Sequence, residues 1–489
     1  MILKEHGVVY GKQKTRLSFT IIEVLLAMGL FALTVGGGTT VAVQAFSTNR
    51  LGEEESYANL LVSEGIEAVR AIATRDYFNL VNGTYGLTTG GNIWGFSGSS
   101  DTFGRFTRTI LISNVYRDAS KNIVNSGGTL DLFTKKVESR ITWSFSPGRT
   151  DTVSLVTYLT FWQTSICNWS SVSQAGSLNL PGSGDAQDIS VVGSKAYVTT
   201  MSNSSAGEFF ILSLSNPSSP TKTGEFEVGG NANAVAVSGN YAYLATSKSG
   251  LEMIVVNVSN PSSPTKTTQV DIPGVTQAND IAVSGNYAYV VTPVSASSGE
   301  FYIYDVSSPG SPVLKSNFEV GSDVNSVYVN GGRAYLATAR ADKELIVLDV
   351  SNPLSPSERG SYDIPSIGAT GQSVFYGGGV VYLMTRDNTG STAEYYLLDA
   401  SNPTSITLVG SLDISGRVNG IAAGVGFSIL ATEKTGQEFT VVSTTNPSSP
   451  TKLSSLGLNW KALGMALQGC YAYIASADDN QEIKVVTPH

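Results

Sequence analysis

Hydrophobic and polar residues follow three different patterns along this chain of 489 residues. Residues 19–46 are apolar or small and carry one charge, Glu23. Residues 51–72 then place apolar side chains at helical spacing, and from about residue 106 short runs alternate between apolar and polar positions. The pattern predicts a long helix over residues 19–80, hydrophobic in its first half and amphipathic in its second, followed by β-structure.

The apolar run is long enough to cross a membrane, because about 20 helical residues span a bilayer. Four basic residues between Lys4 and Arg16 precede it, so residues 1–18 are expected to stay in the cytoplasm while the rest is exported. A secretory signal fits poorly, since the run is too long and no small-residue cleavage site ends it. A plain membrane anchor is the other alternative, but it does not explain an ionisable group near one end of the run.

The sequence LSFTIIEVLLAMGLFAL, residues 17–33, resembles the prepilin signal of type IV pilins and type II secretion pseudopilins. The resemblance implies that a prepilin peptidase cuts between Ser18 and Phe19 and methylates the new amine. Glu23 is then the fifth residue of the mature chain. The family usually has glycine before the cut, where this chain has Ser18. In a bundle of such helices, Glu23 of one subunit would neutralise the Phe19 amine of another, where a lone charge is costly.

A small head domain is expected over residues 81–166. Residues 81–100 are rich in Gly, Ser, Thr and Asn and predict a loop. One strand is expected at 106–115, and two more on either side of a hairpin turn at 146–148, where apolar positions alternate. The segment 135–162 resembles the sheet of minor pilins, which implies a pilin-like α+β head.

From about residue 174 the sequence repeats, with units such as NAVAVSGNYAYLAT (233–246) and NDIAVSGNYAYVVT (279–292). Each unit also has a short strand such as EFEV (225–228) and a proline-containing turn. Four short strands per unit at this period are typical of a β-propeller, so residues 174–489 predict seven blades. One tyrosine position recurs, and it is more typical of blade packing than of glycan binding. Its seven occurrences, 44 to 47 residues apart, are Tyr197, Tyr243, Tyr289, Tyr335, Tyr382, Ile429 and Tyr473.

The ends of the repeat region do not coincide with a unit boundary. Residues 177–180 align with the fourth strand of a unit, and the chain stops after a segment that aligns with the third strand. Residues 174–180 can therefore complete the last blade, which closes the ring and removes exposed sheet edges. Residues 167–173 are interpreted as a linker. The segment GLEMIVVNVSNPSSPTKTTQVDI, residues 250–272, resembles LVIVD-type propeller repeats.

The two cysteines, Cys167 and Cys470, permit one disulfide. Cys470 takes the place of asparagine in the first hairpin turn of the last unit, and Cys167 lies shortly before the segment expected to complete the same blade. The first turn and the start of the fourth strand lie at the same end of a four-stranded antiparallel blade. We therefore expect a disulfide that locks the ring, and two unrelated buried thiols are the alternative.

Composition narrows the chemistry further. The only histidines are His6 and His489, at the two extremes, which argues against a histidine-based triad or metal site. The net charge is −9 and no basic cluster follows the leader, so no nucleic-acid partner is expected. No enzyme activity, cofactor or metal is expected either. Four aspartates are candidate calcium ligands, but aspartate in hairpins and loops is more typical of turns: Asp185, Asp188, Asp478 and Asp479.

These features predict a multidomain chain: a leader at 1–18, the pilin helix at 19–80, the head at 81–166, a linker at 167–173 and the propeller at 174–489. The expected function is that of a minor type IV pilin-like subunit that displays the propeller as an adhesion or binding module for a surface glycan or protein. The subunit would reside in the cytoplasmic membrane before assembly with other pilin subunits and outside the cell afterwards. A bulky propeller favours a tip position, because every subunit of a shaft would have to accommodate it. The alternatives are a pseudopilin of a type II secretion-like system and a surface-anchored propeller enzyme.

Overall fold

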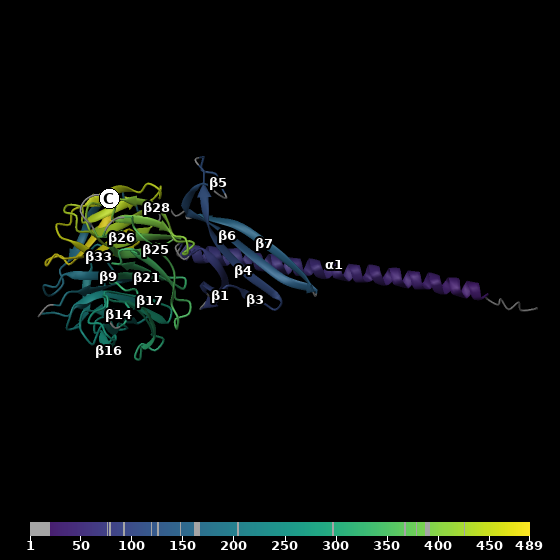
Figure 1. Ribbon diagram of the computed structural model, residues 1–489, viewed down its shortest axis with the longest axis horizontal. Coiled ribbons are helices and arrows are strands. Elements are labelled where there is room, and N and C mark those ends of the chain that lie inside the picture. Colours follow the sequence, from purple (N-terminus) through teal and green to yellow (C-terminus); the bar gives the residue numbers. More distant parts are fainter. Residues whose placement is uncertain are drawn as a thin grey trace, which may run out of the picture.

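The computed structural model describes residues 20–489 except 76, 78–79, 91–92, 119, 125–126, 147, 161–166, 203–204, 296–297, 366–367, 378, 387–391 and 425. The described residues form one long helix, a small sheet beside its second half, and a ring of seven four-stranded sheets beyond the sheet (Figure 1). Ser18 and Phe19, on either side of the predicted cleavage point, lie outside the described residues. The architecture is the predicted one: a long helix with a small antiparallel sheet, then an all-β propeller of seven blades.

Helix α1 (Ile21–Arg75) has two different halves. In the first half the apolar side chains are exposed, including Ile21 at 79 % and Phe31 at 70 %, and the helix is long and apolar enough to cross a membrane. In the second half apolar side chains such as Val62 and Val69 are buried against the sheet. Gly36–Gly38 stay helical, and no atom lies near the place of an added Cβ there, so packing within this chain does not require these glycines.

The head sheet has the strand order β2-β1-β4-β6-β7, with two short strands paired to β4. Its strands are β1 (Gly83–Gly90), β2 (Ile93–Ser97), β3 (Asp101–Phe103), β4 (Phe106–Arg117), β5 (Ile123–Val124), β6 (Thr129–Ser146) and β7 (Arg149–Thr160). The strand at 106–115 is as predicted, and β6 and β7 pair from Thr134–Thr160 to Ser146–Arg149 as the predicted hairpin requires, while residue 147 of its turn lies outside the described residues. The loop predicted at 81–100 is wrong, because β1 and β2 form there. Their few apolar residues alternate, and Leu87, Trp94 and Phe96 pack into the core between helix and sheet.

The propeller strands a to d of each blade run from the centre of the ring outwards, and all neighbours are antiparallel. Blade 1 contains β9 (Ala186–Val192), β10 (Lys195–Thr200), β11 (Phe209–Ser213) and β12 (Thr221–Phe226). Blade 2 contains β13 (Ala232–Ser238), β14 (Tyr241–Thr246), β15 (Met253–Asn257) and β16 (Thr265–Val270). Blade 3 contains β17 (Asp280–Ser284), β18 (Tyr287–Val291), β19 (Phe301–Asp305) and β20 (Val313–Phe318). Blade 4 contains β21 (Val324–Asn330), β22 (Arg333–Thr338), β23 (Leu345–Asp349) and β24 (Ser357–Tyr362).

The remaining three blades follow the same order. Blade 5 contains β25 (Gly371–Gly377), β26 (Val380–Thr385), β27 (Tyr395–Asp399) and β28 (Thr407–Leu412). Blade 6 contains β29 (Val418–Gly424), β30 (Phe427–Thr432), β31 (Phe439–Ser443) and β32 (Thr451–Leu456). Blade 7 contains β33 (Ala462–Gln468), β34 (Tyr471–Ser476), β35 (Ile483–Pro488) and, from the other end of the region, β8 (Val172–Leu178).

The hydrophobic cores lie between neighbouring blades. Each of seven clusters combines side chains of two adjacent sheets, as Met253 and Val255 of blade 2 do with Tyr302 and Tyr304 of blade 3. The recurring tyrosine of the sequence belongs to these cores, since none of its seven occurrences is more than 4 % exposed. The packing interpretation of this position is therefore correct, and the tyrosines are not available to a ligand.

The ring closes as predicted, because β8 pairs with β35 and completes blade 7. The pairing begins at Val172, two residues before the predicted segment. A disulfide joins Cys167 to Cys470 with a Cα–Cα distance of 5.3 Å. Trp169, 2 % exposed, packs against Phe427 and Phe439 of blade 6. The segment interpreted as a linker is therefore bound to the propeller over most of its length.

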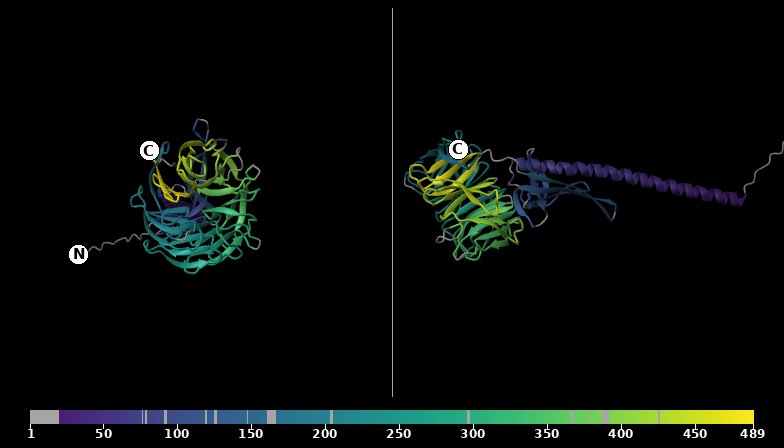
Figure 2. Two further views of the ribbon diagram at one scale, coloured as in Figure 1. Left: turned by 90° about the vertical axis from the view of Figure 1, so that its left-hand side faces the viewer. Right: turned by 90° about the horizontal axis from the view of Figure 1, so that it is seen from above.

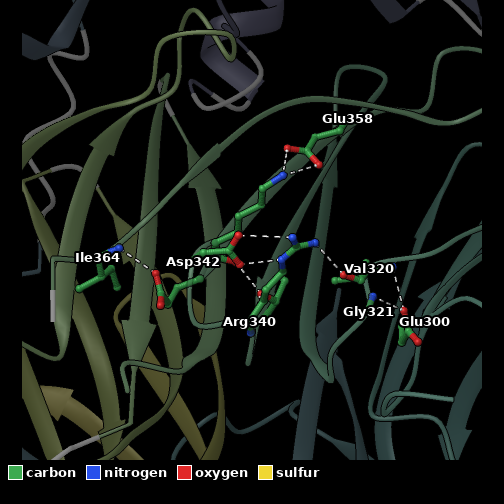
Figure 3. Close-up of polar contacts among 10 residues, drawn as sticks. Glu300, Val320, Gly321, Arg340, Asp342, Glu358 and Ile364 are labelled. Atoms are coloured by element: carbon green, nitrogen blue, oxygen red, sulfur yellow. Dashed lines mark hydrogen bonds and ion pairs between the residues drawn. The ribbon is translucent and has the colours of Figure 1, made fainter. Parts of the chain in front are cut away.

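One buried glutamate in each blade holds the end of strand d. Glu300, 0 % exposed, lies just before strand c, and its Oε2 accepts hydrogen bonds from the backbone N–H groups of Val320 and Gly321 at 2.8 and 2.9 Å (Figure 3). The predicted short strands therefore end earlier than expected. In EFEV (225–228), strand d ends at Phe226, and Val228 lies beyond it and donates its N–H to the buried glutamate. The equivalent carboxylates are Glu208, Glu252, Glu344, Glu394, Glu438 and Glu482, which bind Val228, Ile272, Ile364, Ile414, Leu458 and Leu180.

A cation from the following blade binds the carbonyl of the same residue in several blades. Arg340 of blade 4 donates to the carbonyl of Val320 at 3.0 Å, while Glu300 of blade 3 holds its N–H (Figure 3). Lys248, Lys434 and Lys484 make the corresponding bonds to Val228, Ile414 and Leu458. Both polar groups of one backbone unit are therefore paired across the boundary between two blades.

The head packs directly on one face of the ring, at the a–b turns of blades 4 to 6. Val81 joins the core between blades 4 and 5, and Leu130 joins the core between blades 5 and 6. The Tyr116 hydroxyl donates to Asp399 at 3.3 Å. Lys135 is 0 % exposed and donates to Asn82 and Asn114, and burial lowers the pKa of Lys135 to about 7. These shared cores fix the propeller to the head.

Glu300→Gln tests the role of the buried carboxylates. An amide would turn one N–H group toward the backbone N–H donors, so the free energy of unfolding should fall by about 2–3 kcal/mol. Urea denaturation monitored by circular dichroism measures this. The matched control is Glu358→Gln, which removes a surface ion pair with Lys343 and should cost below about 1 kcal/mol. Equal small losses in the two variants would contradict the assigned role.

The disulfide has a separate test. A non-reducing peptide map of the exported protein should recover a joined Cys167–Cys470 peptide, and two free thiols would contradict the pairing. The bond closes a loop of 303 residues. By the chain-entropy estimate it contributes on the order of 5 kcal/mol, so Cys470→Asn, which restores the residue of the other turns, should lower the unfolding midpoint. The variant should not respond to a reductant, whereas the wild type should fall to its level.

Candidate functional site

The two faces of the ring differ in what they contact. The a–b turns meet the head, while the loops joining strand d to strand a and strand b to strand c lie at the opposite ends of the strands. That second face is turned away from α1, as the view from the propeller end shows (Figure 2). We call it the distal face. It is the face on which a ligand could bind without displacing the head.

A cavity of about 740 Å³ lies along the axis of the ring, and residues at the distal ends of the inner strands, such as Gln187 and Arg417, are part of its lining. The seven innermost strands line it, namely β9, β13, β17, β21, β25, β29 and β33. The lining is rich in amide, hydroxyl and carboxylate groups, including Gln187, Asn233, Ser326 and Ser373. Such a wall suits a polar ligand better than a hydrophobic one.

Most side-chain amides of the cavity wall link one blade to the next. Asn233 donates to the carbonyl of Ala278 at 2.7 Å, and Asn279 donates to that of Val324 at 2.8 Å. Asn325 and Asn419 make the same bond to Gly371 and Ala462. These nitrogens therefore hold the inner strands together, and only the remaining polar groups can serve a ligand.

Two aspartates of the cavity lining, one in blade 1 and one in blade 3, each lie one residue further along the inner strand than the amide residue. Asp188 accepts from the N–H groups of Ile189 and Val235, and Asp280 accepts equivalently from Ile281 and Val327. Burial and the charge of Asp188 raise the pKa of Asp280 to about 7. Since the oxygens of both are already bonded to the backbone, they act as links between blades.

The other aspartates considered as calcium ligands, Asp185, Asp478 and Asp479, lie in loops of the distal face. Asp478 forms an ion pair with Lys484 at 2.7 Å. Burial and the neighbouring charge of Asp479 raise the pKa of Asp185. Among the described residues, no three His, Cys, Asp or Glu side chains are grouped to hold a metal ion.

The inter-blade pattern changes between blades 5 and 6. Gln372 stands where blades 2, 3, 4 and 6 have asparagine, and its oxygen accepts from Arg417 at 3.0 Å and Arg386 at 3.4 Å. Glu433 lies 3.7 Å from Arg417 and 2.8 Å from Lys461. Burial and the charge of Arg386 lower the pKa of Arg417, whereas Lys461 holds the pKa of Glu433 low against the effect of burial. This stretch of the cavity mouth therefore has more positive than negative charge.

Of the residues predicted at the N-terminus, Glu23 has a local role that the sequence reasoning missed. Its carboxylate accepts from the backbone N–H of Thr20 at 3.0 Å, while the Thr20 hydroxyl accepts from the N–H of Glu23 at 3.3 Å. This reciprocal pair is a capping box, which satisfies free N–H groups at the start of α1. The T-x-x-E spacing before an apolar run was the signal for it.

Two further sets of residues escaped the sequence reasoning. The seven buried glutamates recur at a near-constant interval before strand c, so their spacing could have identified them. Arg417 and Gln372 could not be found that way, because no spacing links them and only the closed ring brings them together.

Comparison with known proteins agrees with this architecture. The model of the LVIVD repeat matches residues 183–228, 229–272, 276–320, 321–364 and 392–414. A chain in the crystal structure of the mitotic checkpoint complex is 12 % identical, with a TM-score of 0.51, and the match covers 68 % of this chain and 99 % of that one. The WD40 β-propeller domain of Doa1 is 13 % identical, with a TM-score of 0.49 over 65 % of this chain and 97 % of that one. No curated protein has significant sequence similarity to the chain.

The matched stretches coincide with blades 1 to 4 and the second half of blade 5, each ending at the residue that the buried glutamate holds. At 12 % identity the structural likeness shows the fold alone. The LVIVD repeat model matches five stretches of the repeat region, and the strand order shows that the whole region forms a seven-bladed β-propeller.

Proposed function

We propose that this chain is a type IV pilin-like subunit that displays its propeller outside the cell as a binding module. The observation that carries the proposal is α1. One continuous helix has an apolar, uncovered half at one end, and the head and propeller are attached to its other end. The arrangement holds the propeller away from whatever surrounds the apolar half (Figure 1).

The apolar half of α1 needs a non-aqueous environment. Ile21, Ile22 and Leu33 are each more than 70 % exposed, and no part of the propeller or head covers them. Leaving such side chains in water is unfavourable by about 25 cal/mol per Å². Lipid supplies the environment before assembly, and the helices of other pilin subunits supply it afterwards, which accounts for the single-pass anchor and for the proposed partners.

Glu23 fits this assembly chemically. Cleavage before Phe19 by a prepilin peptidase creates a positive amine four residues from the carboxylate. Within one subunit the Glu23 carboxylate accepts from the backbone N–H of Thr20, which keeps this carboxylate at the start of the helix. In an apolar bundle the amine of a neighbouring subunit is the group that compensates this carboxylate best.

For the propeller we favour binding over catalysis. Its interior polar groups are used to join blades, as Asn233 and Asp188 show. The distal face carries the groups that depart from the repeat, and a surface glycan or protein is the expected partner there. A propeller larger than the head favours a minor subunit at a filament tip. A pseudopilin of a secretion system would share the same helix and head.

Mass spectrometry of the mature N-terminus tests the proposal. The chain isolated from its host should begin at Phe19 and carry a methylated amine. A chain beginning at Met1, or one cut after residue 40, would refute the pilin reading. Immunogold labelling of the propeller on intact cells then separates a filament tip from a shaft, and absence of labelled filaments would favour the secretion pseudopilin.

Glu23→Gln provides a sharper test than Glu23→Ala. Glutamine preserves the capping box but removes the negative charge, so the helix start should remain intact while incorporation into sheared filaments falls at least tenfold. Quantitative immunoblots of sheared filaments and membranes measure the ratio. Glu53→Gln, an exposed position of the same helix outside the apolar run, is the matched control and should assemble normally. Normal incorporation of Glu23→Gln would contradict the charge-pairing role.

A further inference from the structure

The distal rim carries opposite charges at equivalent positions. The last residue of the loop before strand a is Asp185, Asn231 and Asp323 before blades 1, 2 and 4, but Arg417 and Lys461 before blades 6 and 7. The backbone equivalence is explicit, because in all five the carbonyl of this residue accepts a hydrogen bond from the loop after strand b. One sector of the rim has therefore exchanged acidic or neutral groups for cations.

The acidic and neutral groups have a structural use that the cations lack. The side chain of Asn231 accepts from the N–H of Ser202 at 2.9 Å, and that of Asp323 accepts from Val294 at 2.8 Å. Arg417 cannot accept, and it loses this link between loops. A change that gives up a stabilising contact of the repeat marks a position with another role.

Arg417 is only partly satisfied. Its one hydrogen bond among the described residues is to Gln372, and its Nε–H is buried without a partner there. Glu433 is the single carboxylate paired with both Arg417 and Lys461, and Arg386 shares the Gln372 oxygen. The sector thus holds three cations, with Glu433 paired to two of them and Asp185 near enough to interact with Lys461, in a chain whose net charge is −9. An anion bound there would supply the missing acceptors.

An exposed tryptophan lies beside these cations. Trp460 is 51 % exposed and directly precedes Lys461. The equivalent loop positions before blades 2, 4 and 6 hold Gly230, Ser322 and Gly416. A large aromatic ring at a position that elsewhere needs only a small residue is available for contact with a ligand.

We infer that this basic sector, Arg386, Arg417 and Lys461 with Trp460, binds a carboxylate-bearing polysaccharide. Arg417 and its neighbours hold the carboxylate, and Trp460 lies against a sugar ring. The amide nitrogens of Asn233 and Asn325 donate to neighbouring blades, while their amide oxygens accept no hydrogen bond among the described residues. The polar cavity beside the cations therefore has free acceptors for the hydroxyl groups of a sugar. The inference deepens the proposed function, because it names the chemical class of the surface ligand.

Binding of tri-galacturonate to the purified full-length protein in detergent tests this site. Its methyl ester is the uncharged comparison and an oligoglutamate of equal charge is the peptide comparison, and isothermal titration calorimetry measures each affinity. We expect tri-galacturonate to bind at least tenfold more tightly than its ester, with an affinity that falls as salt rises. Arg417→Gln and Lys461→Gln should each weaken binding about tenfold, and Trp460→Ala should do so without changing the salt dependence.

The matched control is Lys266→Gln, an exposed lysine on the outer strand of blade 2, which should bind as the wild type does. Thermal unfolding shows whether each variant is folded. Binding unaffected by Arg417→Gln and Lys461→Gln, equal affinity for the ester, or no binding of any probe would overturn the inference. Tighter binding of oligoglutamate that survives Trp460→Ala would also overturn it and indicate an acidic peptide. Leader cleavage and filament assembly do not enter this experiment, so its failure leaves the pilin-like proposal to its own tests.

Discussion

The propeller depends on a buried carboxylate that holds the end of each outer strand. Proline-containing turns lead into strand d, and the residue held by the carboxylate, such as Val320, lies just after that strand ends and has no strand partner. Glu300 and its equivalents supply a carboxyl oxygen as acceptor for that N–H inside the protein, where a hydrogen bond is stronger than in water. A buried charge without such donors would be costly. The carboxylate therefore needs the N–H groups that follow strand d, and those N–H groups need the carboxylate as their acceptor. The cores between blades can be close-packed because these ends are fixed.

The same interaction explains how the ring closes. Glu482 of blade 7 binds the N–H of Leu180 although the two are far apart in the chain, so the last blade uses the bond found in all the others. Strand β8 then completes that blade, and the Cys167–Cys470 disulfide lies at the end of the sheet where β8 begins. Closure therefore uses the carboxylate bond and strand pairing of the other blades, with the disulfide as its one addition. The last blade forms the same contacts as the others, although its strands come from the two ends of the repeat region.

Periodicity made most of the fold predictable, and departures from it mark what was missed. The tyrosine period gave seven blades, and the unequal ends of the repeat gave the closing strand. The β1–β2 hairpin was missed because glycine and threonine masked the alternation of Leu87 with its neighbours, whose burial only the helix reveals. Gln372 and Arg417 were missed for a different reason. Neither residue is unusual alone, and their contact arises only when two blades meet at the cavity mouth.

The junction with the head determines how a force applied at the distal rim would reach α1. Val81 and Leu130 of the head are part of the cores between blades, and Lys135 is buried with amide oxygens around it beneath blade 5. Gly379, at φ +92°, brings the turn of that blade against the Lys135 ammonium, where a Cβ would lie 3.0 Å from Nζ. Rotating the propeller on the head would expose apolar surface and leave a buried cation without its acceptors. A load on the rim is therefore carried through packed cores to α1 and not through a flexible tether, as the proposed display of a bound ligand would require.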